Sequence, residues 1–77
     1  MSETRYLYDY VSHEPKLYQL GYYIYALDGH TPLHWVDGAY GYSCSENKPS
    51  LWIDGKFLYR YSDGLETNPQ PMYYYGD

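Results

Sequence analysis

The sequence predicts an all-β fold, either a small twisted antiparallel sheet or a partly open barrel, built on two Asp-Gly hairpins. Three observations predict it. Tyrosine accounts for 14 of the 77 residues, and aromatic residues favour strands. Several stretches alternate in polarity, as half-buried strands do. The dipeptide Asp-Gly, a strong hairpin signal, occurs at 28–29, 37–38, 54–55 and 63–64.

The Asp-Gly dipeptides are regularly placed. The stretches DGHTPLHWVDG and DGKFLYRYSDG both hold seven residues between two Asp-Gly pairs, and the second begins 26 residues after the first. Seven residues is about the length of one strand, so each stretch predicts a strand between two turns. The pattern fits two similar hairpins as well as a true duplication.

The strands follow from these turns and from the alternation between them. Leucines at helical spacing leave a short helical turn near 14–20 as an alternative, although Gly21 and the aromatic run after it oppose a helix. Pro69 and Pro71 favour an extended backbone, so 66–77 is expected to be an extended tail or an edge strand. We expect strands at 4–11, 18–27, 31–36, 50–53 and 57–62.

Alternation also predicts which side chains face the core. On 5–11, Arg5 and Asp9 mark the wet face, because successive residues of a strand point to opposite faces. The same reasoning applies to 57–62. On 18–27 both faces are apolar after residue 21. The face with Ile24 is taken as inward, but aligning the two Asp-Gly stretches pairs Leu27 with Ile53 and would reverse this facing, and a bulge at Gly21 could reconcile the two. The expected inward residues are Tyr6, Tyr8, Tyr10, Tyr18, Leu20, Tyr22, Ile24, Ala26, Phe57, Tyr59 and Tyr61.

Chain length sets the domain organisation. Residues 1–77 suffice for a single small domain, and a domain of this size has marginal stability unless something reinforces it. Cys44 is the only cysteine, so it cannot form an internal disulfide. Association is the remaining reinforcement, and we therefore expect a homodimer.

The charge balance narrows the partners. Ten acidic and five basic residues give a net charge of −5, which disfavours direct binding to nucleic acid and adhesion to an anionic membrane. The sequence has neither a signal-peptide pattern nor an apolar run of spanning length. We therefore expect a cytoplasmic protein.

No residue pattern indicates catalysis. His30 and His34 share a face of a predicted strand, but Pro32 lies between them and no further ligand has the spacing of a metal motif. Cys44 has no nucleophile motif around it. The Asp-Gly aspartates lack the alternating carboxylates of a calcium loop. We expect no enzyme activity, no cofactor and no metal.

The remaining function is binding. Tyrosine and tryptophan are preferred interface anchors, and this small domain holds more rings than its core can hide. We expect a protein-interaction module that binds a larger protein, in the manner of the small acidic inhibitors or regulators of cytosolic proteins encoded by phages and other mobile elements. A carbohydrate-binding module with an aromatic platform and a nucleic-acid-mimicking inhibitor are the alternatives. The expected partner-binding residues are Tyr23, Tyr25, Trp52 and Tyr74, edged by His34 and Arg60.

Overall fold

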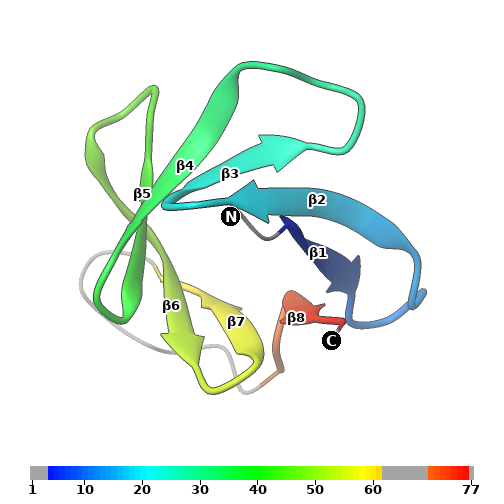
Figure 1. Cartoon of the computed structure of the whole chain (residues 1–77). Coiled ribbons are helices and arrows are strands. Elements are labelled where there is room, and N and C mark those ends of the chain that lie inside the picture. The colour runs from blue at the N-terminus through cyan, green and yellow to red at the C-terminus, as the bar shows by residue number, and fades with distance from the viewer. Residues whose placement is uncertain (1–3, 62–69, 77) are drawn as a thin grey trace.

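The computed structural model describes residues 4–61 and 70–76, which form a closed antiparallel barrel. Each strand pairs with the next in the chain, and the last pairs with the first, so the strands form a ring (Figure 1). The predicted all-β fold is confirmed, and the barrel is closed rather than partly open. The strands are β1 (Thr4–Asp9), β2 (Pro15–Leu20), β3 (Tyr23–Ala26), β4 (Pro32–Asp37), β5 (Tyr40–Ser43), β6 (Lys48–Asp54), β7 (Phe57–Arg60) and β8 (Tyr73–Tyr75).

The predicted strand 18–27 is wrong as a single element. A tight turn at Gly21 and Tyr22 divides it into β2 and β3. The helical alternative near 14–20 is also wrong, because β2 occupies these residues. The strand β5, with the sequence YGYS, was not predicted at all. β8 pairs with both β7 and β1, so it closes the barrel instead of forming an edge.

The tight turns explain why two Asp-Gly dipeptides mark hairpins. In each, the aspartate ends a strand and the glycine is the first of two turn residues. Gly38 and Gly55 have φ angles of 66° and 63°, and Gly21 has 64°. Glycine reaches this region without steric cost, and a glycine first in a two-residue turn matches the twist of a hairpin. The dipeptide at 28–29 lies in the longer connection between β3 and β4, and 63–64 lies outside the described residues.

The barrel is built from four similar units of two strands: β1–β2, β3–β4, β5–β6 and β7–β8. Gly21, Gly38 and Gly55 follow one another at intervals of 17 residues. Pro15, Pro32 and Pro49 do the same, and each lies beside an irregularity in the register of its unit. The period of the fold is therefore 17 residues, and the 26-residue interval between the Asp-Gly stretches is not a structural repeat.

Backbone hydrogen bonds repeat with the same period. The Val36 N–H donates to the Tyr22 carbonyl over 2.7 Å, and the Ile53 N–H donates to the Ala39 carbonyl over 2.7 Å. The last unit has a longer connection but keeps this bond, from the Tyr75 N–H to the carbonyl of Lys56, over 2.8 Å. Equivalent positions of different units can therefore be compared directly.

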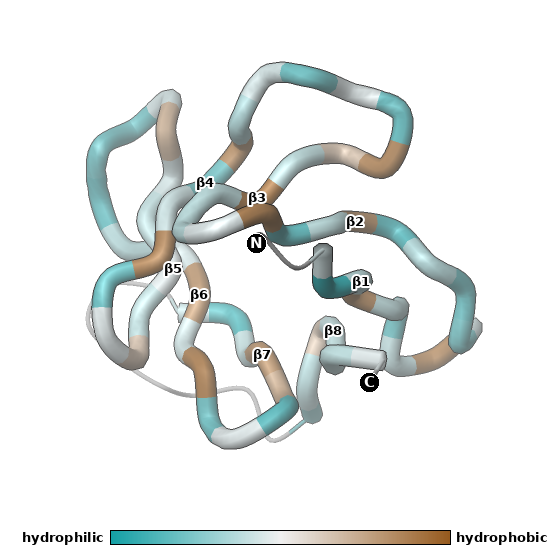
Figure 2. Tube along the Cα trace, in the orientation of Figure 1, coloured by the Kyte–Doolittle hydropathy of each residue, from teal (hydrophilic) through white to brown (hydrophobic). Residues whose placement is uncertain are grey.

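The core is small and aliphatic. Leu7, Ile24 and Leu58 occupy equivalent positions and are fully buried. The corresponding residue of the β5–β6 unit is Gly41, and a Cβ atom there would lie 3.2 Å from the Cβ atom of Leu51, so Leu51 fills the space. The most hydrophobic residues accordingly appear as short, isolated segments of the chain (Figure 2). The complete buried cluster is Leu7, Leu17, Ile24, Leu51, Leu58 and Tyr75.

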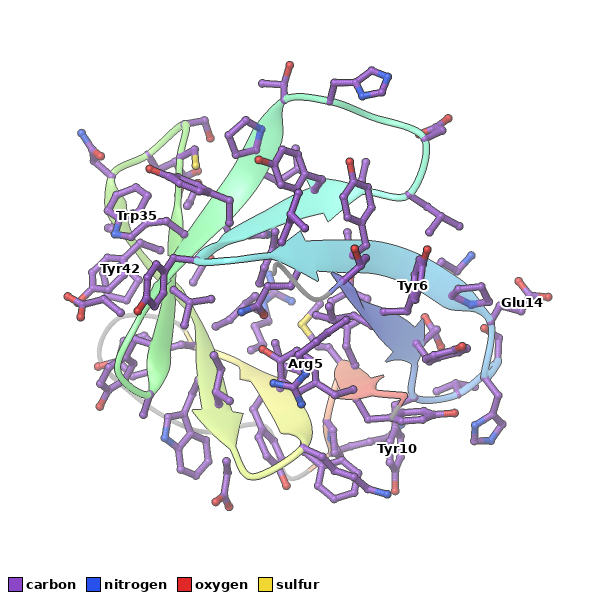
Figure 3. All side chains as sticks on the ribbon, in the orientation of Figure 1. Arg5, Tyr6, Tyr10, Glu14, Trp35 and Tyr42 are labelled. Atoms are coloured by element: carbon purple, nitrogen blue, oxygen red, sulfur yellow. The ribbon has the colours of Figure 1, made fainter. Side chains whose placement is uncertain are left out.

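The predicted facing of β1 and β7 is wrong. Alternate residues on these strands, Leu7 and Leu58, fill the interior, so the neighbouring tyrosines and Phe57 lie on the outer face. The cause is the width of a closed barrel, which admits Leu and Ile more readily than rows of tyrosine rings. A charged residue is tolerated inside near a barrel end: the Arg5 guanidinium lies 3.6 Å from the centre of the Tyr75 ring (Figure 3).

On β3 the prediction is partly confirmed. Ile24 is buried, while Tyr23 and Tyr25 lie on the outer face. Leu20 and Tyr22, expected inside, are exposed, because the turn at Gly21 ends β2 before the alternation reaches β3. Tyr18 is also on the outer face, where its hydroxyl donates to the Gly29 carbonyl over 2.9 Å.

Candidate interaction surface

Aromatic side chains surround the outside of the barrel. On every pair of neighbouring strands, including β8 and β1, two aromatic residues lie directly opposite each other in register. Each unit contributes one aromatic residue at each of three equivalent positions. This aromatic belt consists of Tyr6, Tyr8, Tyr18, Tyr23, Tyr25, Trp35, Tyr40, Tyr42, Trp52, Phe57, Tyr59 and Tyr74.

Many of the belt rings stack on one another. Tyr18 and Tyr25 have ring centres 5.0 Å apart with planes 11° apart. Trp35 and Tyr42, which lie side by side in Figure 3, have centres 5.1 Å apart with planes 9° apart. Both pairs join consecutive units across a glycine turn. Cross-strand aromatic pairs contribute roughly 0.5–1.5 kcal/mol each beyond the area they bury. The belt therefore reinforces a barrel whose core is small.

The belt is not covered equally on all sides. Among the described residues, every exposed large apolar side chain lies between residues 6 and 33 or at Met72. Between residues 34 and 61, none of the large apolar side chains is exposed. Four of the nine exposed large apolar side chains in the described ranges lie at the turn of Gly21 or on the strands beside it. We call the group Tyr6, Leu20, Tyr22 and Tyr23, whose exposed fractions are 47%, 37%, 74% and 48%, the Gly21 hairpin patch.

Strand register brings the patch together. Leu20 lies directly opposite Tyr23 across the turn. Leu20 also pairs with Thr4 at the start of β1, and Tyr6 follows two residues later on the same face. Tyr22 is the second turn residue and has the largest exposed fraction of the patch. Three neighbouring strands and the turn between two of them therefore supply the residues of the patch.

An acidic depression borders the patch. It is lined by Tyr22, Val36, Asp37 and Gly38. A backbone hydrogen bond joins two of these residues, from the Val36 N–H to the Tyr22 carbonyl. Asp37 is exposed and forms no ion pair with any residue in 4–61 or 70–76. The depression is therefore lined by an exposed acidic residue and by the most exposed tyrosine of the patch.

The aromatic residues expected to bind a partner lie in different environments. Tyr23 belongs to the Gly21 hairpin patch. Tyr25 is half-buried against Tyr18, and Trp52 is half-buried with its ring centre 5.1 Å from that of Tyr59. Both rings therefore already pack against another ring of the barrel.

Tyr74 is held in the same way. Its ring stacks on Tyr8 at 5.6 Å, and its hydroxyl is 2.9 Å from Nδ1 of His13. This contact joins β8 to the connection between β1 and β2. The ring therefore contributes to barrel closure.

The two polar residues expected at the edge of the surface are placed elsewhere. His34 faces the barrel interior, in register with Ile24, and its Nδ1 is 3.2 Å from the Ser50 hydroxyl. Burial lowers the pKa of His34 below its usual value. Arg60 is exposed at the end of β7, two residues after Leu58. The six expected residues come from β3, β4, β6, β7 and β8 and do not form one surface.

Sequence reasoning missed Leu20, Tyr22 and the outward direction of Tyr6. A signal was present in the 17-residue period. It aligns Leu20-Gly21-Tyr22 with Asp37-Gly38-Ala39 and with Asp54-Gly55-Lys56. Only the first of these turns has a large apolar residue on both sides of its glycine.

No metal-binding cluster accompanies this surface in the described ranges. No three His, Cys, Asp or Glu side chains of these ranges are grouped to hold a metal ion. Cys44 is half-buried as a free thiol. Nor does this part of the chain contain a helix with the length and apolar character needed to cross a membrane. Comparison with protein-family models, curated proteins and solved structures finds no match for the chain.

Proposed function

We propose that the chain is a small acidic protein-interaction module that binds a larger protein through the Gly21 hairpin patch. The observation that carries this proposal is the exposure of Leu20 and Tyr22, on either side of a glycine turn whose equivalents have Asp37 and Ala39 or Asp54 and Lys56. Contiguous exposed apolar side chains on a soluble domain mark binding surfaces.

The other units provide an internal control for this argument. Their turns have the same glycine conformation and strand register with charged or small residues at the same positions. The fold therefore does not require large apolar residues beside Gly21. Tyrosine is also a preferred residue at the energetic centre of an interface, so Tyr22 and Tyr23 are the proposed anchors.

We further propose the role of an inhibitor or regulator of a cytosolic protein, of the kind encoded by phages and mobile elements. The support is the small size, the net charge of −5 and the lack of a catalytic motif in the sequence. A carbohydrate platform is less well supported, because the stacked belt rings cover one another's faces. A nucleic-acid mimic is less well supported because Asp28, Asp37 and Asp54 lie at separate turns and connections rather than in one stripe.

Capture from a lysate of the native host tests the proposal with a matched pair of variants. In the first variant, Leu20→Asp with Tyr22→Ala, the Gly21 turn receives the residues of the Gly38 turn. In the second, Asp54→Ala with Lys56→Ala, the Gly55 turn is changed instead. Both should keep the far-ultraviolet circular dichroism of the wild type.

Quantitative mass spectrometry should find a protein captured by the wild type and by the Gly55-turn variant. The Gly21-turn variant should capture at least about tenfold less of it, which is roughly 1.4 kcal/mol of binding. Equal capture by all three chains would contradict the proposal.

A further inference from the structure

The proposed function leaves the kind of partner open. Building on it, we infer that the Gly21 hairpin patch binds a short extended segment of the partner. An arginine or lysine of that segment enters the depression beside Asp37, and its apolar side chains cover Tyr6, Leu20 and Tyr23. The extent of the patch, the charge beside it and the closure of the barrel support this inference.

The extent of the patch fits a segment rather than a folded surface. Its exposed fractions together amount to about two whole side chains, or on the order of 300–500 Å² for aromatic residues. A stable interface between two folded proteins buries roughly 800 Å² on each side. A short segment requires less area, and its few anchors can all contact the patch.

The charge beside the patch selects a basic residue. Asp37 and Tyr22 line the same depression, and a basic side chain there could pair with the carboxylate and lie near an aromatic residue. The chain as a whole has a net charge of −5, which attracts basic segments over longer distances. Lys16 and Lys48 do not offset this at the patch, because they are paired with Glu14 and Glu46 at the start of β2 and β6.

The same charges disfavour a second copy of this chain as the occupant. A symmetric dimer places the same patch on both sides of the interface. It would bring Asp37 of one copy towards Asp37 of the other and would oppose two chains of charge −5. A basic partner segment avoids both repulsions.

Barrel closure determines how the segment binds. Every strand is paired on both sides, so an extended peptide finds no free strand edge for backbone pairing in the described ranges. Affinity must then come from side chains in contact with the patch. Sequence preference should therefore be strong at the basic position and at the apolar positions beside it.

A nuclear magnetic resonance titration with defined peptides tests the inference. The first peptide has one arginine between leucine and phenylalanine residues in a Gly-Ser background, and the second has glutamate in place of the arginine. Added to the ¹⁵N-labelled chain, the arginine peptide should shift the amide signals of Tyr22 and Asp37. It should bind at least about tenfold more tightly than the glutamate peptide.

Two variants identify the carboxylate. Asp37→Asn should reduce the preference for arginine to about threefold or less, which is below roughly 0.7 kcal/mol. Asp54→Asn, the equivalent change at the Gly55 turn, should leave the preference unchanged. Loss of the preference in both variants would mean that net charge, and not the depression, selects the peptide, and would overturn the inference.

Other results would also overturn it. These are equal affinity for the two peptides, no shift with either, or shifts confined to other strands. If the same amides shift with protein concentration alone, the occupant is a second copy. If lysate capture depends on Leu20 and Tyr22 but neither peptide binds, the inference of a short basic segment is refuted. The proposed function would then still stand.

Discussion

Leu20 lies directly opposite Tyr23 across the turn at Gly21, and both side chains are exposed. The same pair in the next two units is Asp37 with Tyr40 and Asp54 with Phe57. In each case an aromatic residue begins the following strand, but only the first turn places an aliphatic residue opposite it. The repeated scaffold therefore carries an apolar residue before the glycine at the Gly21 turn and an aspartate at the equivalent position of the other two turns.

The glycine turns should be sensitive to their backbone conformation. Gly55→Val should lower the free energy of unfolding by about 1–3 kcal/mol, because Gly55 has a φ angle of 63° that a β-branched residue opposes. Lys56→Ala should change it by no more than about 0.5 kcal/mol. Urea denaturation measures both values. Similar midpoints for the two variants would mean that the turn tolerates other conformations.

The belt should stabilise the barrel through its pairs. Trp52→Ala and Tyr59→Ala should each destabilise the fold, and the two losses should not add, since either change removes the same ring contact. A double-mutant cycle should give a coupling energy of about 0.5–1.5 kcal/mol. Additive losses would show that the rings act independently and that the belt is not a stabilising network.

His34 should make stability depend on pH. Its pKa is lowered by burial below the usual value of 6.5, so below that pH the unfolded chain binds a proton more readily than the folded one. The free energy of unfolding should therefore be unaffected by His34 above about pH 6.5. It should decrease as the pH falls from there towards the folded-state pKa. Urea midpoints measured between pH 7.5 and pH 5 would reveal the slope.

Leu17 and Leu51 stand at the position equivalent to His34 and show what the fold accepts there. His34→Leu should flatten the slope and, at acidic pH, raise stability by about 1 kcal/mol. His30→Ala, at an exposed histidine, is the control and should keep the slope of the wild type. An unchanged slope in His34→Leu would assign the pH dependence to another group.

Homodimerisation remains a prediction of the sequence. Sedimentation at micromolar concentrations should show a dimer that is stronger at high salt, because salt screens the repulsion between chains of charge −5. A monomer at all concentrations and salt levels would refute it. A dimer that survives Leu20→Asp with Tyr22→Ala would use another face of the barrel.

The fold class could be predicted because the turns have local chemistry. Asp37-Gly38 and Asp54-Gly55 specify their hairpins within a few residues. Gly21 was missed because Leu20 precedes it where aspartate precedes the other two, so the apolar run appeared continuous. The 17-residue period contained this information, but it is visible only when turns with different flanking residues are compared.

The facing of the strands could not be predicted by polarity alone. Tyrosine is apolar enough to suggest a core position and polar enough to remain at the surface. Leu7 and Leu58 determine which face of β1 and β7 points inward, because a narrow closed barrel favours aliphatic side chains inside and aromatic pairs outside. The candidate surface was accordingly found only in part, through Tyr23, while Leu20 and Tyr22 were assigned to the core.

Photo-crosslinking tests the central claim most directly. The crosslinking residue p-benzoylphenylalanine would replace Tyr22 in one chain and Lys56 in another, since both are the second residue of a glycine turn. In host cells, position 22 should crosslink to a specific larger protein, and position 56 should not. Crosslinks of equal yield from both positions, or from position 56 alone, would contradict a docking surface at the Gly21 hairpin.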